Sequence, residues 1–240
     1  MKTFSLLALS TLCAAQAWSG VIANSVADFS GVQGQGGLFY GFFNQTANGA
    51  YSTANFVEFA NFVGGVWRPS DAQVGAQNNQ FLNSSSQGGH PAGIGPSTQD
   101  AAIWAMRRFV STVCGNIVIA YDLGKLNVSE PNGGGITGRI FLDGVPVFAQ
   151  FIANLDGAGV QGVLNLSVDV GSKIHFAIDP LGVAGGSGDN PLSARADGSR
   201  FTAVISTAEV PEPTTGLLAC AALAGFGIKK LYSGRAPVFN

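Results

Sequence analysis

Charged residues are scarce in this chain of 240 residues: they make up 11% of it, against about 25% in ordinary globular proteins. Between residues 18 and 209 there are thirteen acidic and eight basic residues, which gives a net charge of −5. A protein that binds nucleic acid needs a basic surface to meet the phosphates. We therefore expect no nucleic-acid partner.

Cysteine and histidine are scarcer still, with three and two residues. Cys13 and Cys220 lie near the two ends, so Cys114 is the single cysteine of residues 18–209, and no disulfide can form within that region. Cys114 lies in a strand-like run, which favours a buried, unreactive side chain. Zinc needs three or four His or Cys ligands at short spacing, and a hydrolase triad needs a histidine beside an activated nucleophile. His90 and His175 are far apart and no Gly-x-Ser-x-Gly motif is present, so we expect no enzyme and no catalytic residues.

Glycine, in contrast, is abundant, with 34 residues, about twice the usual share. Together with many Asn, Ser, Thr and Gln residues, it suits an exported all-β protein with long turns. The run 71–99 is the most polar stretch and predicts a long surface loop.

Apolar residues alternate with polar ones through most of the second half, as expected for strands with one face in a core. Asp143-Gly144 is a strong hairpin signal, because a type I′ turn needs two residues with positive φ, and Pro146 predicts an edge or bulged position just after it. His175 alternates with apolar neighbours and should face solvent or a second layer. The expected strands include 101–110, 117–121, 125–128, 136–142, 145–152, 164–170, 174–178 and 201–205, and in the first of these Ala105, Arg107 and Phe109 share one face. Short strands of this kind predict two packed sheets, an all-β, jelly-roll-like β-sandwich over residues 18–209.

Aspartates recur in the second half, mostly at turn positions where they bond backbone N–H groups. One group suggests more: Asp179, Asp189 and Asn190 place oxygen ligands around a flexible glycine loop. Calcium takes carboxylate, amide and carbonyl oxygens, so a structural calcium is one interpretation, and a solvated turn is the other. No other cofactor is expected.

Three aromatic residues are candidates for stacking on a sugar: Tyr40, Trp67 and Trp104. Exposed rings of this kind form binding platforms in glycan-binding proteins. A sandwich core also consumes aromatic side chains, and that is the alternative.

The first seventeen residues are typical of a secretory signal peptide. Lys2 provides the positive start, an apolar run follows, and Ala15 and Ala17 form a small-x-small cleavage site. We therefore expect an exported protein whose mature chain begins at Trp18.

The last part of the chain, residues 210–240, has three components. Val210, Pro211, Glu212 and Pro213 form an extended marker, an uncharged run over 214–228 follows, and Lys229 and Lys230 close it. A helix over 214–228 would be roughly 22 Å long, short of the ~30 Å hydrocarbon core of a bilayer. A short apolar helix with a basic end is typical of a temporary membrane anchor.

This tail resembles the PEP-CTERM sorting signal of Gram-negative bacteria, in its marker, its apolar helix and its basic end. The resemblance implies that an exosortase, a membrane protease-like enzyme, processes the chain at the inner membrane. The passenger would then reach the cell surface or the extracellular space. The alternative is a simple C-terminal membrane anchor.

Residues 18–209 are similar to uncharacterised bacterial secreted sandwich domains, which often stand beside sorting signals or in carbohydrate-active proteins. The resemblance implies a jelly roll and no established activity. It rests on Gln33-Gly34-Gln35, Tyr40-Gly41-Phe42, Trp67, Gly89-His90-Pro91, Trp104–Phe109, Gly138–Gly144 and Phe176–Pro180. We expect a non-enzymatic surface or extracellular-matrix protein; the alternative is a carbohydrate-binding module or carbohydrate-active enzyme of the envelope or exopolysaccharide.

Overall fold

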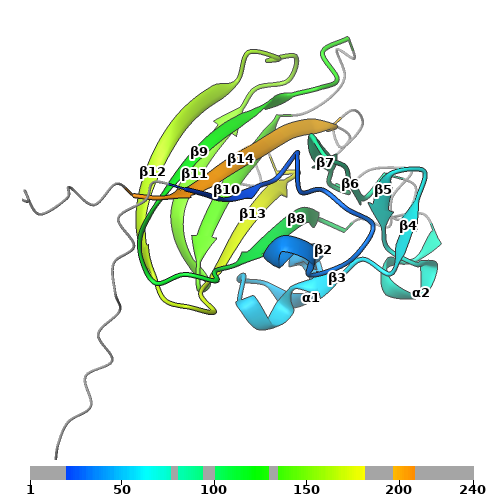
Figure 1. Cartoon of the computed structure of the whole chain (residues 1–240). Coiled ribbons are helices and arrows are strands. Elements are labelled where there is room, and N and C mark those ends of the chain that lie inside the picture. The colour runs from blue at the N-terminus through cyan, green and yellow to red at the C-terminus, as the bar shows by residue number, and fades with distance from the viewer. Residues whose placement is uncertain (1–19, 77–80, 94–100, 130–134, 182–196, 209–240) are drawn as a thin grey trace, which may run out of the picture. The chain divides into compact units, whose positions relative to one another are not determined.

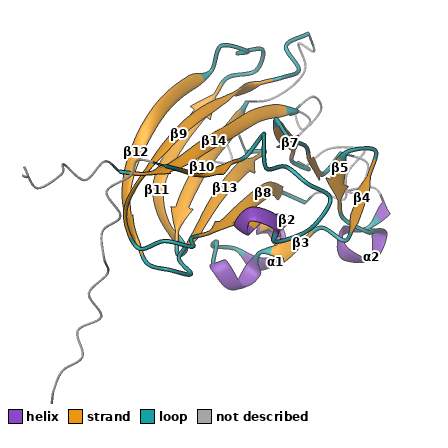
Figure 2. Ribbon diagram, in the orientation of Figure 1, coloured by secondary structure: helices purple, strands orange, loops and turns teal. Residues whose placement is uncertain are grey.

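Residues Gly20–Ala208 form one compact unit built from two β-sheets that face each other across a core (Figure 1). The structure is a computed structural model, and it describes residues 20–76, 81–93, 101–129, 135–181 and 197–208. Strands dominate, and the helices are short and lie at the margin (Figure 2). The predicted β-sandwich is confirmed.

Sheet A has eight strands in the order β12-β9-β14-β7-β6-β5-β4, with β1 also paired to β14; sheet B has six in the order β11-β10-β13-β8-β2-β3. The strands of sheet A are β1 (Val21–Asn24), β4 (Asn61–Val63), β5 (Val66–Arg68), β6 (Asn83–Ser84), β7 (Gly88–His90), β9 (Gly115–Lys125), β12 (Val160–Val168) and β14 (Ser199–Thr207). Those of sheet B are β2 (Leu38–Asn44), β3 (Val57–Glu58), β8 (Ile103–Val110), β10 (Ile136–Leu142), β11 (Val145–Ile152) and β13 (Lys173–Asp179). The helices are η1 (Gln35–Gly37), α1 (Gln45–Asn48), η2 (Thr53–Asn55) and α2 (Asp71–Val74).

The main core lies between the sheets and follows from the period-two pattern of the strands. Ile117, Ile119 and Leu123 of β9 are fully buried and face Ile140 and Phe109 of sheet B in one cluster. Each such side chain contributes roughly 1.5–3 kcal/mol by leaving water.

A second apolar cluster covers the outer face of sheet B. It contains Phe43, Trp104 and Phe141 from three strands, and Tyr51 and Phe56 from the segment that follows α1. The segment reaches over the sheet because Gly41 has no side chain: a Cβ there would collide with the Val57 carbonyl and the Phe56 ring. Sheet B is therefore buried on both faces along β8 and β13.

His175 lies under this second layer with no exposed surface. Its Nε2 accepts a hydrogen bond from Arg108 Nε at 2.7 Å, and the Arg108 guanidinium lies 4.0 Å from the centre of the Phe56 ring. Of the two expected positions, solvent or a second layer, the second is correct. Burial, with the nearby charge of Arg108, lowers the pKa of His175 to about 3.

The hairpin prediction is confirmed. Asp143 has φ 50° and Gly144 φ 89°, as a type I′ turn requires. Pro146 lies in the edge strand β11, beside a shift of register between Ile140 and Phe141.

Three local expectations are wrong. Residues 125–128 do not form a strand of their own, because β9 runs without a break to Lys125 and an exposed turn follows. The polar run 71–99 is not one loop, since its described part holds α2, β6 and β7. Cys114 is half-buried and disulfide-bonded, so it is not a buried free thiol.

Among the described residues, no helix has the length and apolar character needed to cross a membrane. The expected signal peptide, its cleavage residues Ala15 and Ala17, and the whole of 210–240, from Val210 to Lys229 and Lys230, lie outside the described residues.

We predict that His175 stays neutral well below the ordinary histidine pKa of 6.5. The unfolded chain binds a proton there near pH 6.5 and the folded chain does not, so this contribution to the free energy of unfolding is complete above pH 6.5 and falls as the pH drops toward 3. Long-range ¹H–¹⁵N NMR of the imidazoles should show the Nδ1–H tautomer at pH 5, because Nε2 accepts from Arg108.

The variant His90→Gln leaves one histidine in the chain and assigns the signals. In denaturing urea the same signal should titrate near pH 6.5. A titration of the folded protein near that value would contradict the buried position of His175.

Candidate functional site: the braced end of the sandwich

The chain passes from sheet A to sheet B between β9 and β10, and it returns to sheet A between β13 and β14. Both connections start and finish at the same end of the sandwich. Lys125, the last residue of β9, pairs in register with Ser199, the first of β14, in sheet A. Thr137 of β10 pairs with Asp179, the last residue of β13, in sheet B. The strand ends from which these two connections leave are therefore neighbours within each sheet. We call this region, defined by Lys125 and Ser199 in sheet A and by Thr137 and Asp179 in sheet B, the braced end.

A buried ion pair holds the sheet A side of the braced end. Lys125 Nζ lies 2.8 Å from Asp197 Oδ1, and neither side chain has any exposed surface. The backbone N–H groups of Leu126 and Asn127 both donate to the Gly198 carbonyl. The start of one connection is thus fixed to the end of the other. Burial raises the pKa of Asp197 to about 7, against the attraction of Lys125.

A second ion pair holds the sheet B side. Nε and Nη2 of Arg139 each lie 3.0 Å from Asp179 Oδ2, while Oδ1 accepts the N–H of Leu181 at 2.9 Å. Thr137 Oγ1 donates to the Leu181 carbonyl at 3.0 Å. Burial raises the pKa of Asp179 to about 6, and Arg139 opposes this shift.

The Arg139 brace also touches the second apolar cluster. Its guanidinium lies 5.3 Å from the centre of the Trp104 ring, and Trp104 Nε1 donates to Gln45 Oε1 of α1 at 3.1 Å. The helix that follows β2 is therefore held at the same end of sheet B.

Arg107 holds the hairpin of β6 and β7 from inside the core. It is 4% exposed, and its guanidinium donates to the carbonyls of Ser85, Ser86, Gly88 and Phe201. Burial lowers its pKa to about 10, so it remains a cation at neutral pH. A cavity of about 10 Å³ lies beside it, room for about one water molecule. The alternation of β8 could have predicted that Arg107 is buried, because it shares a strand face with the core residues Ala105 and Phe109.

His90, at the end of β7, is neutral. Its Nδ1 lies 2.6 Å from the Pro91 carbonyl, and burial lowers its pKa to about 4. The Phe81 ring packs 5.6 Å from the imidazole. His90 is a packing residue of the hairpin rather than a group aimed at solvent.

The three aromatic residues expected to stack on a sugar are used in packing instead. Tyr40 and Trp67 stack on each other in the main core, 5.9 Å between ring centres, with exposed fractions of 0% and 5%. Trp104, 5% exposed, belongs to the second cluster. This corrects the platform interpretation: rings this buried present no face to a ligand.

Asp179, the first of the three expected calcium ligands, is not available to bind a metal ion. Asp179 is 1% exposed and its carboxylate is taken by Arg139 and the Leu181 N–H. Asp189 and Asn190 lie outside the described residues. Within the described ranges, no three His, Cys, Asp or Glu side chains gather as a metal site would require.

Comparisons with known proteins find only distant structural likenesses. No protein-family model matches the sequence, and no curated protein matches it. CBM51 from Clostridium perfringens GH95, solved with methyl-galactose, is 13% identical with a TM-score of 0.31, over 69% of this chain and 99% of that one. CBM35 from Paenibacillus barcinonensis is 11% identical with a TM-score of 0.25, over 50% and 84%. A β-glucosidase from Kluyveromyces marxianus is 11% identical with a TM-score of 0.30, over 88% of this chain but 21% of the enzyme.

We predict that Lys125→Met alone lowers the free energy of unfolding by about 3–5 kcal/mol, because it leaves the Asp197 carboxylate buried without its cation. The double variant Lys125→Met/Asp197→Leu should recover most of that loss, since it replaces two charges with apolar side chains of similar volume. Urea denaturation monitored by circular dichroism measures both.

The matched control is the surface pair of Arg200 and Asp122, 2.9 Å apart and 22% and 28% exposed. Arg200→Met/Asp122→Leu should change the free energy of unfolding by about 0–1 kcal/mol. Equal losses for Lys125→Met and the double variant would show that the buried pair is not a brace.

Proposed function

We propose that this protein is an exported, non-enzymatic component of the cell surface or extracellular matrix, sorted by an exosortase-type system. The β-sandwich is the passenger, and the two terminal segments direct it to its place. The tail 210–240 is the sequence feature that carries the sorting part of the proposal. In this proposal the protein is held in the inner membrane only until it is processed, and it is then released to the cell surface or the extracellular space.

One structural observation supports a non-enzymatic role for the passenger. The charged side chains at the braced end and in the nearby core are occupied with each other or with backbone carbonyls: Lys125 with Asp197, Arg139 (15% exposed) with Asp179, and Arg107 with a hairpin. A general acid or base must reach a substrate proton within hydrogen-bond distance. The charged groups of these side chains are directed at each other or at the backbone, on both faces of sheet B, and not at solvent.

We predict that sorting depends on the marker in the tail. In a host with its exosortase gene, the intact mass should show loss of the chain beyond Pro211–Pro213, and the protein should leave the inner membrane. Deletion of that gene, or Pro211→Ala/Glu212→Ala/Pro213→Ala, should leave the unprocessed chain in the inner-membrane fraction. The same mass with and without the gene would overturn the sorting proposal.

A second candidate function is glycan binding at the braced end. Its support is geometric: loops carry recognition when a rigid scaffold positions them, and both ends of the connection from β13 to β14 are held by ion pairs, Arg139 with Asp179 and Lys125 with Asp197. An envelope or exopolysaccharide glycan is the ligand that fits an exported protein. Recognition would then come from the connections and not from Tyr40, Trp67 or Trp104.

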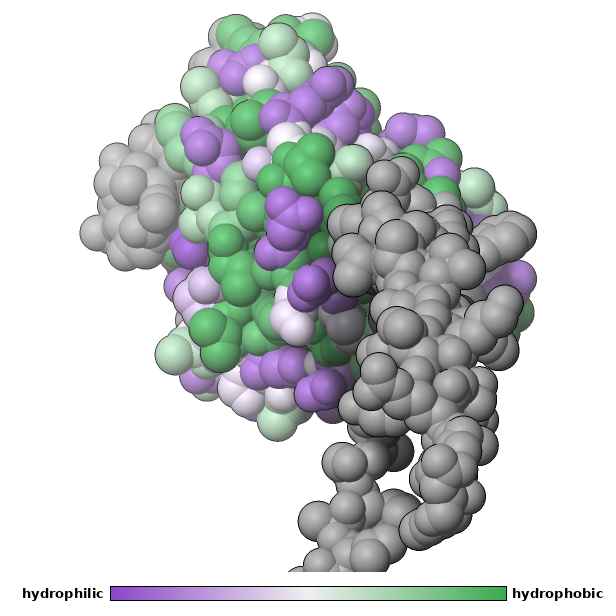
Figure 3. All heavy atoms as spheres, turned by 60° about the vertical axis from the view of Figure 1, so that its left-hand side comes forward, coloured by the Kyte–Doolittle hydropathy of each residue, from purple (hydrophilic) through white to green (hydrophobic). Residues whose placement is uncertain are grey.

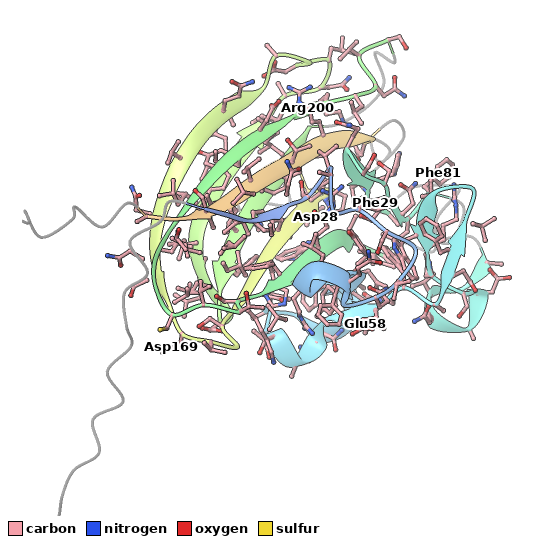
Figure 4. All side chains as sticks on the ribbon, viewed as in Figure 1. Asp28, Phe29, Glu58, Phe81, Asp169 and Arg200 are labelled. Carbon is pink, nitrogen blue, oxygen red and sulfur yellow. The ribbon has the colours of Figure 1, made fainter. Side chains whose placement is uncertain are left out.

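We predict that the protein is retarded in native gels containing the host exopolysaccharide. Arg139→Met/Asp179→Leu should weaken the retardation at least about threefold, because it removes the brace while keeping side-chain volume. Asp169→Asn is the control, since Asp169 lies at the opposite end of the sandwich from Arg200 and the braced end (Figure 4). Equal retardation of all three proteins, or none, would reject glycan binding at this end.

A further inference from the structure

The five strands of the two sheets that have a free edge differ in how well they are protected against pairing with another chain, and β1, which pairs only with β14, has just four residues. Natural edges are kept apart by shortness, charge, proline or a bulge. β3 and β4 have two and three residues, and β11 carries Pro146 beside a register shift. β12 has nine residues, no charged residue and no proline, and it pairs with β9 in unbroken register. Among the described residues nothing pairs with its outer edge.

The core is incompletely covered along β12. Val160, Leu164 and Leu166 face the core but are half-buried, whereas Ile117 and Ile119 of the neighbouring β9 have no exposed surface. On the side of the molecule that carries β12, hydrophobic residues form broad areas broken by hydrophilic ones (Figure 3). A partner strand laid against β12 would bury apolar surface as well as form hydrogen bonds.

The burial pattern of β12 is compatible with pairing to an antiparallel copy of itself. A copy centred on Leu164 places core-facing residues opposite core-facing ones and outward-facing, uncharged residues opposite one another. The pairs are Val160 with Val168, Gln161 with Ser167, Gly162 with Leu166, Val163 with Asn165, and Leu164 with itself. In this register the five core-facing residues of one copy lie opposite the five core-facing residues of the other, and the four outward-facing residues likewise lie opposite each other, because side chains alternate with a period of two.

We propose that β12 pairs with β12 of a second copy of this chain, antiparallel about a two-fold axis at Leu164. The pairing joins two eight-stranded sheets A into one continuous sheet. No like charges oppose each other in this register, since the strand has no charge and Asp169 lies just beyond its end. The strand is already extended, so association orders no new backbone. This goes beyond the proposed sorting and holds whatever directs the protein to its location.

Two double variants test the register through charges placed on the solvent face. Val163 is 60% exposed and Asn165 is exposed, and each lies opposite the other residue of the second copy. Val163→Lys/Asn165→Lys opposes lysine to lysine twice and should raise the dimer dissociation constant at least about tenfold. Val163→Lys/Asn165→Glu opposes lysine to glutamate twice and should keep the dimer, with an affinity that falls as salt is added.

Sedimentation velocity of the full chain over a range of concentrations measures the dissociation constant of each variant, and circular dichroism checks that the fold is retained. Val63→Lys is the matched control, since Val63 is 66% exposed at the other edge of sheet A, and it should sediment as the wild type. A wild type that is monomeric at every concentration, or that associates only with another protein or a glycan, overturns the proposal. So does equal behaviour of the two charge variants, because only this register distinguishes them.

Discussion

Two ion pairs, one fully and one mostly buried, hold the strand ends at which the chain leaves and re-enters its sheets. A carboxylate taken from water into a protein interior is costly unless a cation and hydrogen-bond donors replace the lost water. Asp179 meets this condition with Arg139 and the Leu181 N–H, whereas Asp197 receives Lys125 at Oδ1 and its Oδ2 has no hydrogen-bond partner among the described residues. Because the partners belong to different connections, each pair ties the start of one crossing to the end of another. The sheets, the connections and α1 all meet at this end.

The outer face of sheet B explains why so few charges are present. A sheet in a sandwich normally turns one face to water, but the segment from α1 to β3 covers β8 and β13 with Tyr51 and Phe56. Side chains that would otherwise be solvated are therefore apolar, or, like His175 and Arg108, hydrogen-bonded to each other, although His175 Nδ1 has no hydrogen-bond partner among the described residues. The aromatic residues of the chain supply two cores, which leaves Tyr40, Trp67 and Trp104 no part in a binding surface.

The proposed role in the cell surface or matrix asks of the passenger that it hold its shape. The two ion pairs hold the described bases of the connections at one end. The side that carries β12 offers a regular and uncharged edge. In a surface layer or matrix, recognition at one end and self-pairing along another side would act independently, since the two involve different strands and different chemistry.

Local sequence patterns predicted the class of fold, the type I′ hairpin at Asp143-Gly144 and the edge position of Pro146, because alternation, positive φ and the missing N–H of proline are local properties. They could not predict that Asp179 pairs with Arg139, that Arg107 holds a hairpin from inside the core or that the candidate sugar-binding rings are buried. Those outcomes depend on which strands become neighbours and which segment covers the outer face of sheet B. Residues far apart in the chain, such as Lys125 and Asp197, carry no mutual signal until the register of β9 with β14 brings them within 2.8 Å.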